Sequence, residues 1–339
     1  MAGQSAKRKR SFTEWLFGKF SLAEPKEIVK LACPLVAMFV MMVMNGAAAD
    51  VYPDGMSSEY YPIFIRVSMV VYLIVAIISI WFEYFRRHFV KWWGLIIFLY
   101  LASGIYNLCT IKSGTLTLPY FPSFESMLAY GFGHVDRMWG DLCNSMVLYV
   151  EGIAIGGVLG FLWGSAMGYS KHANYWLNPL IKIIGPVPGV AWVTISLVLA
   201  PSNHVAALVI IASTTWFPLA VNLAGGIRSV SRESIEKAQT LGASNWYIVR
   251  HVVYPAAAPT IFTGLFMGLC FSLTSLVTAE VMGVQGGLGW RMTWASQAMA
   301  YDIIYTITIT FIIMAFVFIT ILFVVQRHVM SWSKEVVQW

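Results

Sequence analysis

Two acidic residues lie inside long apolar stretches of this 339-residue chain. Ionisable side chains are costly there, so they are candidates for function. Glu151 comes about nine residues into the apolar run that begins near Leu142. It can pair with a neighbouring helix or line a path for a solute. Glu280 lies beside Thr278 near the end of another run. It can line the same path or only anchor the loop that follows.

Asn144 and Thr278 are polar neighbours of these acids and complete the set of candidate path residues. An acid on the path would interact unfavourably with an anion, because like charges repel more strongly where water is scarce. If Glu151 lines the path, we therefore expect a neutral or cationic solute. The sequence alone does not name that solute.

Motifs for catalysis are absent from the sequence. No Gly-x4-Gly-Lys-Ser/Thr phosphate loop occurs, so we do not expect this chain to bind ATP. Neither a serine nucleophile elbow nor zinc-ligand spacing is present. We predict no catalytic residue, no metal and no cofactor in this chain. The cysteines lie in or beside apolar runs without paired spacing, which indicates free thiols: Cys33, Cys109, Cys143 and Cys270.

The elements that hold these residues are predicted from composition. Hydrophobic residues make up 58% of the chain and charged residues only 11%, whereas soluble domains have about a quarter charged residues. We therefore expect an all-α integral membrane protein. A spanning helix needs about 20 mostly apolar residues. The clear apolar runs are Leu31–Ala49, Val67–Phe85, Trp93–Cys109, Leu142–Met167, Val205–Ala224, Ala256–Met282 and Ile303–Val325.

An eighth run, Val187–Ala200, is short and is bracketed by Pro186, Pro188 and Pro201. We expect an irregular span there. Irregular backbone at membrane depth must be buried in protein or line a cavity. The total is about eight transmembrane helices.

The basic residues predict the orientation, because lysine and arginine collect on the cytoplasmic side of membrane proteins. With the N-terminus inside and eight crossings, only Arg66, Lys112, Arg137 and Arg291 of the 22 basic residues lie outside. We expect both termini in the cytoplasm. The Lys/Arg-rich leader, residues 1–30, reads as a basic and amphipathic cytoplasmic segment and not as a nucleic-acid site. The first run shows no convincing cleavage site, so we expect a retained helix.

The longest inside loop, Gly225–Ile261, is far more polar than its flanks. Ser231 can cap a short helix, and Gly242 can end it in the left-handed conformation. A second segment, Trp246–Val253, stops at Pro255, which suits the first turn of the next spanning helix. Such a helix–glycine–helix can fit a groove in a partner, or it can be an ordinary surface loop.

This loop resembles the EAA loop of the permease subunits of binding-protein-dependent ABC importers. The family pattern is E-A-A, three residues, G, nine residues, I-x-L-P. The chain matches the spacing throughout, and it departs from the pattern at Lys237, Val252 and Tyr254. The resemblance implies that residues 225–255 form a coupling loop that docks on an ATPase subunit. The implied docking residues are Glu236, Lys237, Ala238, Gly242, Ala243 and Pro255.

Further segments resemble the nitrate/sulfonate/taurine/bicarbonate group of these permeases. They are Leu116–Leu128, Tyr175–Ile195, Trp216–Gly226 and Thr278–Trp290. The resemblance implies a six-helix ABC importer permease core over residues 93–339. Residues 31–92 then form an extra N-terminal pair of transmembrane helices.

The same resemblance implies an assembly in the bacterial inner membrane that imports a small solute. Its expected partners are a second, identical permease chain, two cytoplasmic ATPase subunits that bind ATP and Mg, and an extracytoplasmic solute-binding protein. One alternative is a secondary transporter driven by an ion gradient, which needs no docking loop. Another is a membrane enzyme acting on lipid, which would need clustered His, Asp or Glu at one membrane face. The polar loop favours the importer.

Overall fold

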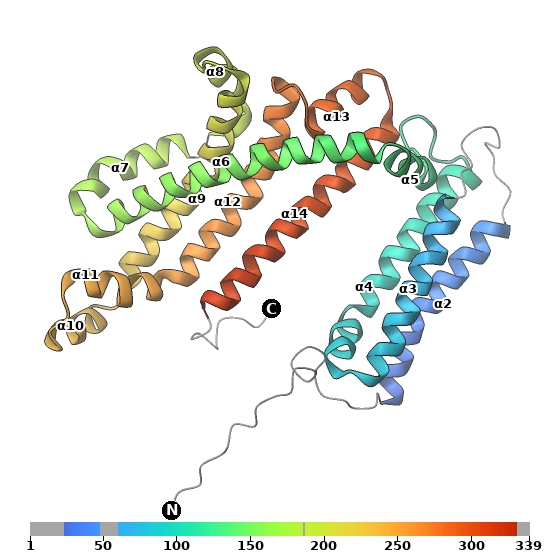
Figure 1. The fold of residues 1–339 in the computed structure, drawn as a ribbon, viewed down its shortest axis with the longest axis horizontal. Coiled ribbons are helices and arrows are strands. Elements are labelled where there is room, and N and C mark those ends of the chain that lie inside the picture. The colour runs from blue at the N-terminus through green and yellow to red at the C-terminus, as the bar shows by residue number, and fades with distance from the viewer. Residues whose placement is uncertain (1–23, 48–59, 186, 331–339) are drawn as a thin grey trace, which may run out of the picture. The chain divides into compact units, whose positions relative to one another are not determined.

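The computed structural model describes residues 24–47, 60–185 and 187–330, and every long element in them is a helix (Figure 1). Seven of these helices are long and apolar enough to cross a membrane. The pair α7 (Lys171–Ile184) and α8 (Gly189–Leu199), bent by 101°, makes an eighth span if it is counted as one. The expected all-α membrane fold with about eight spans is confirmed. The basic leader lies mostly outside the described residues, since only residues 24–30 of it are included.

The chain divides into two compact units, Met1–Gly133 and His134–Trp339. The helices of the first unit are α2 (Pro25–Ala47), α3 (Tyr60–Trp81), α4 (Glu83–Asn107), the π-helix η1 (Leu108–Lys112) and α5 (Phe124–Gly133). The helices of the second unit are α6 (Val135–Tyr169), α7 (Lys171–Ile184), α8 (Gly189–Leu199), α9 (Asn203–Ser229), α10 (Arg232–Thr240), α11 (Asn245–Ile248), the π-helix η2 (Val249–Val253), α12 (Tyr254–Met282), α13 (Leu288–Gln297) and α14 (Tyr301–Val329).

Polar contacts at both ends show that α2 and α4 run parallel in the first unit. Near their starts, Arg86 Nε lies 2.9 Å from Glu27 Oε2. Near their ends, Asn107 donates to the side-chain oxygen of Asn45 at 2.7 Å. Two parallel neighbours need a return crossing between them, and α3 provides it.

The unit boundary lies later than the predicted boundary between residues 92 and 93. Helix α4 contains residues 93–107, and it packs with α2 and α3 through a shared apolar core. By packing, α4 therefore belongs with the N-terminal helices. A permease domain that begins at residue 93 stays a prediction.

A ridge of glycines on α6 brings α9 into close contact in the second unit. A Cβ built on Gly160 would lie 2.9 Å from the Trp216 carbonyl oxygen, and one on Gly164 would lie 2.9 Å from that of Ala220. Glycine spacing of this kind lets helices approach closely. The glycines of Gly156–Gly168 thus serve the packing of α6 against α9.

The glycine contacts also fix the direction of α9 relative to α6. Gly152 faces Ile211, and Gly168, farther along α6, faces Ile227, farther along α9. The two helices are therefore parallel, and the chain must return across the bundle between them. The bent pair α7–α8 makes that return, which accounts for the eighth crossing expected near Val187–Ala200.

Candidate functional site: polar loop, α13 cluster and cavity

The predicted helix–glycine–helix is present at one end of the long helices, opposite α13 (Figure 1). Ser231 caps α10 by accepting a hydrogen bond from the Ser234 N–H, as predicted. Gly242 follows α10 with φ +80°. Its N–H donates to the Gln239 carbonyl, and the Ala243 N–H donates to that of Ala238. This pair of bonds is a Schellman motif, and glycine is favoured there because it enters the left-handed conformation without steric cost.

Pro255 lies in the first turn of the spanning helix α12, as predicted. One difference concerns the second segment of the loop, which does not end before that helix. Instead α11, η2 and α12 follow one another without a gap. Proline has no N–H to donate, so one backbone hydrogen bond is missing at this junction, directly after the wider π turn η2.

The inner face of the loop packs onto the ends of the spanning helices. Leu223 and Ile227 of α9 and Ala257 of α12 are buried in one apolar cluster with Ile248 and Val253. From the loop, the apolar side chains that pack against this cluster include Ile235, Ala238 and Ala243. A force on the loop would therefore reach α9 and α12 through packed side chains.

The outer face of the loop carries large exposed side chains. Leu241 is 88% exposed and Trp246 is 71% exposed. Glu236 and Gly242 are exposed too, and a Cβ built on Gly242 would meet no atom within 4 Å. Isolated exposed apolar residues are ordinary. Here two of them flank the glycine turn, which suits insertion into a groove of a partner.

Contacts explain two of the departures from the EAA pattern. The charge of Lys237 lies on the exposed face of α10. Its ammonium is 2.6 Å from the Glu233 carboxylate one turn earlier, and both side chains are exposed. The hydroxyl of Tyr254 shares a hydrogen bond with Ser165 of α6 at 3.0 Å. Its ring stacks on Phe161. Tyr254 thus ties the base of the loop to α6.

Glu280 lies at the other end of α12 in a buried cluster. It is only 1% exposed, and its Oε2 accepts a hydrogen bond from the Gly289 N–H at 2.7 Å. Ser145 of α6 accepts one from the Leu288 N–H at 2.9 Å. Together they cap the N-terminus of α13, where carboxylates are favoured. This is the anchoring alternative weighed for Glu280, while its role on a solute path stays a prediction.

The remaining path candidates are spread over the half of the unit that contains α13. Glu151 pairs with the His204 imidazole, Oε2 to Nε2 at 2.9 Å, and both side chains are about half exposed. His204 is not isolated, because the parallel packing of α6 and α9 places it beside Glu151. Thr278 donates back to the Thr274 carbonyl. Asn144 lies beside the loop at Gly286.

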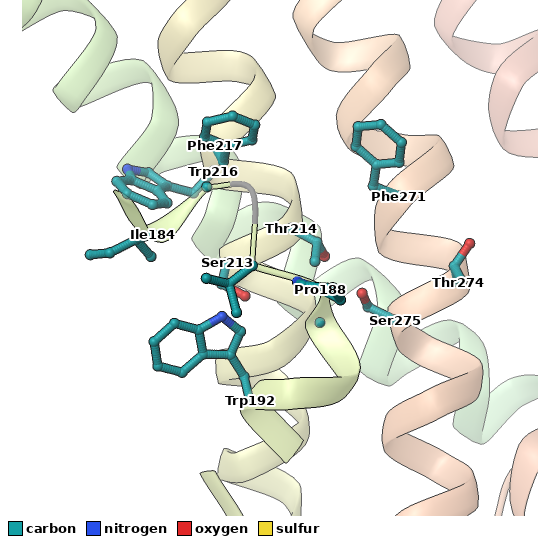
Figure 2. A pocket seen from close by; sticks show the side chains of 13 residues that line it. Ile184, Pro188, Trp192, Ser213, Thr214, Trp216, Phe217, Phe271, Thr274 and Ser275 are labelled. Atoms are coloured by element: carbon teal, nitrogen blue, oxygen red, sulfur yellow. The ribbon is translucent and has the colours of Figure 1, made fainter. Parts of the chain in front are cut away.

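A cavity of about 400 Å³ lies where the chain bends between α7 and α8 (Figure 2). Helices α9 and α12 form its other walls. Of the two alternatives for the irregular backbone near residue 187, burial in protein or lining a cavity, the structure shows the second. Pro186, one of the bracketing prolines, lies outside the described residues. Neither Glu151, Glu280, Asn144 nor Thr278 is among the lining residues.

A family of transport proteins matches much of the second unit. The family model described as "Binding-protein-dependent transport system inner membrane component" matches residues 156–333, slightly more than half of the chain. The match includes residues 225–255, the residues that line the cavity, and α13. The chain belongs to this family.

Similar proteins agree with this assignment. The permease is 29% identical over 205 residues to the taurine transport system permease protein TauC of Escherichia coli, covering 60% of the permease and 74% of TauC. It is 30% identical over 201 residues to the bicarbonate transport system permease protein CmpB of Synechococcus elongatus, covering 57% and 72%. A solved amino acid ABC transporter chain aligns at TM-score 0.49 and 16% identity, covering 58% of the permease and 96% of that chain.

The protein is thus a membrane-spanning permease subunit of an ATP-driven importer, and the predicted function is confirmed. The family is one of multi-pass inner membrane components. Its matched range leaves out residues 1–155 and so all of α2–α5. Sequence reasoning missed the cavity walls, although paired hydroxyl residues inside apolar runs, Ser213–Thr214 and Thr274–Ser275, were a signal for them.

Proposed function

We propose that residues 225–255 of the permease dock on a cytoplasmic ATPase subunit and couple ATP-driven closure to movement of α9 and α12. The observation that carries this proposal is the two-faced loop. Leu241 and Trp246 project outward beside the open Gly242 turn, while Ile235, Ala238 and Ala243 pack inward. An interface core of this kind, with a few large side chains filling pockets, is where binding energy concentrates.

The working assembly that we propose has two identical permease chains, two ATPase subunits that bind ATP and Mg, and an extracytoplasmic solute-binding protein. The excess of basic residues on one set of loops supports cytoplasmic termini and a cytoplasmic coupling loop. The substrate is a small solute of the kind carried by the taurine and bicarbonate relatives. The path residues Glu151, Glu280, Asn144 and Thr278 remain candidates within this scheme.

The docking role is tested with Gly242→Asp in the reconstituted permease–ATPase complex. Aspartate tolerates the left-handed conformation better than most residues, so the turn should survive while charge and bulk enter the docking surface. We expect loss of assembly with the ATPase or of solute-stimulated ATP hydrolysis, measured by co-purification and phosphate release.

Three further variants separate the causes. Gly242→Asn keeps the size of aspartate without its charge, so it distinguishes bulk from charge. Leu241→Ala and Trp246→Ala should each raise the Kd for the ATPase about tenfold or more, with little change in permease stability because both side chains are mostly exposed. Normal coupling in all four variants would rule out docking at this loop and would reopen the ion-driven transporter.

A further inference from the structure

The cavity at the α7–α8 bend has walls of two chemical kinds (Figure 2). Figure 2 shows Trp192 from α8 on one side of the view and Phe271, Thr274 and Ser275 from α12 on the other. The walls include four aromatic rings, Trp192, Trp216, Phe217 and Phe271, and four hydroxyl groups, Ser213, Thr214, Thr274 and Ser275. Not one of its lining residues carries a formal charge.

The cavity lies deep in the membrane part of the second unit. Ser213 is ten residues beyond the start of α9 at Asn203. At about 1.5 Å per residue that is about 15 Å along the helix, roughly half of a hydrocarbon core of about 30 Å. A solute held there must leave bulk water, so the walls have to replace its hydration.

The hydrogen-bonding groups of α9 present acceptors to this cavity. The Ser213 hydroxyl donates to the Ile210 carbonyl at 2.8 Å, and that of Thr214 donates to the Ile211 carbonyl at 2.9 Å. Each hydroxyl oxygen keeps lone pairs that can accept from a ligand. Pro218 has no N–H, so the Thr214 carbonyl lacks its usual helical donor. These groups suit a ligand that donates hydrogen bonds.

The aromatic rings point to the same kind of ligand. The faces of tryptophan and phenylalanine rings attract cations, and most strongly where water is excluded. An ammonium group would therefore find ring faces together with hydroxyl and carbonyl acceptors. A bare inorganic anion would find no counter-charge among the lining residues, and burying an unpaired charge is expensive.

A net positive charge meets the same difficulty, because no carboxylate lines the cavity. A zwitterion carries no net charge, so its burial leaves no uncompensated net charge in the cavity. We propose that this cavity is a solute-binding site on the transport path, and that it takes small zwitterions with an ammonium group and about the size of taurine. This inference rests on the proposed importer function and deepens it by naming the substrate class.

Gly189 keeps the cavity open where α8 approaches α12. A Cβ built on it would lie 2.8 Å from the Ser275 Oγ and 3.4 Å from the Thr214 Cγ2. Any larger residue would intrude between these two polar side chains. The absence of a side chain at residue 189 thus leaves both within reach of a ligand.

The test measures equilibrium binding of radiolabelled taurine and of β-alanine to the full-length permease–ATPase complex in lipid nanodiscs, without a binding protein. We expect saturable binding of at least one zwitterion, which excess nitrate or bicarbonate does not displace. Thr214→Val removes one acceptor without a change of shape, and Trp192→Ala removes a ring face. Each should weaken binding about tenfold.

Thr263→Val on α12 is the matched control. Like Thr214, Thr263 donates its hydroxyl to a carbonyl of its own helix, that of Pro259. Thr263 is exposed and does not line the cavity. It should bind the zwitterions normally. Lack of saturable binding of both zwitterions overturns the proposal. So does nitrate or bicarbonate binding that depends on Thr214 and Trp192.

The binding experiment and the coupling experiment with Gly242→Asp test different parts of the permease. Binding needs the cavity but not a working docking loop, so Gly242→Asp permease should still hold the zwitterion. If coupling is lost in Gly242→Asp while neither zwitterion binds the unaltered protein, the importer function stands and the cavity inference fails.

Discussion

At the scale of single residues, the buried Glu280 side chain holds the start of α13 through a hydrogen bond. Its Oε2 accepts from the Gly289 N–H, and the Arg291–Asp141 ion pair joins α13 to α6 nearby. Side-chain contacts of this kind can be predicted from a sequence only in part. Ser231 and Gly242 were predictable because a cap and a left-handed turn depend on adjacent residues. The Glu151–His204 pair was not, because its members are 53 positions apart.

Glu280→Ala should remove the acceptor at the start of α13 and leave a buried N–H unpaired. We expect unfolding of the detergent-solubilised permease to become easier by about 1–3 kcal/mol. Glu280→Gln keeps an oxygen for the Gly289 N–H and should lose much less. Thermal unfolding of both variants measures the difference.

The same pair of variants tests the path role of Glu280. If Glu280 serves only as an anchor, Glu280→Gln should transport solute at nearly the normal rate. A large loss of transport in Glu280→Gln at unchanged stability would instead place this carboxylate on the solute path.

At the scale of elements, the close contact of α6 and α9 depends on which face of α6 carries the small residues. The face was predictable because glycines recur about one turn apart between Gly156 and Gly168. The partner helix was not, because apolar stretches on α9, α12 and α14 offer similar surfaces. The prolines around residue 187 predicted an irregular segment. That this segment lines a cavity depends on how α9 and α12 pack around it, which the sequence does not show.

Gly164→Ala and Gly157→Ala make a matched pair on α6. A Cβ on Gly164 would lie 2.9 Å from both the Ala220 oxygen and the Leu223 Cβ, whereas one on Gly157 meets no atom within 4 Å. We expect Gly164→Ala to destabilise the permease by about 1–3 kcal/mol through overpacking. Gly157→Ala should be neutral or stabilising by up to about 1 kcal/mol, because alanine favours helix. Chemical or thermal unfolding in detergent compares them.

At the scale of the whole chain, the number of crossings follows from pairs of parallel helices. In the first unit α2 and α4 are parallel and α3 returns between them. In the second unit α6 and α9 are parallel, so α7–α8 must return as well. Hydropathy found the seven long spans, but it could not decide whether a bent pair of short helices crosses. The direction of α9 relative to α6 decides it, and that direction is a property of the folded chain.

Eight crossings place His172, before the bent pair, and Pro201, after it, on opposite sides of the membrane. Gln239 in the coupling loop should lie on the same side as His172. The test uses single cysteines at these three exposed positions, in a background where the four native cysteines are replaced. In right-side-out vesicles a membrane-impermeant maleimide should label the Pro201→Cys variant alone. The His172→Cys and Gln239→Cys variants should react only after the vesicles are opened.

The contrary outcome is labelling of His172→Cys and Pro201→Cys from the same side of the membrane. It would mean that α7–α8 enters and leaves the membrane on that side. Helices α6 and α9 would then cross in opposite directions, and Gly152 and Gly168 could not face Ile211 and Ile227 in that order. Opposite-side labelling would support the glycine ridge, the eighth crossing and the cytoplasmic coupling loop together, because all three depend on the same direction of α9.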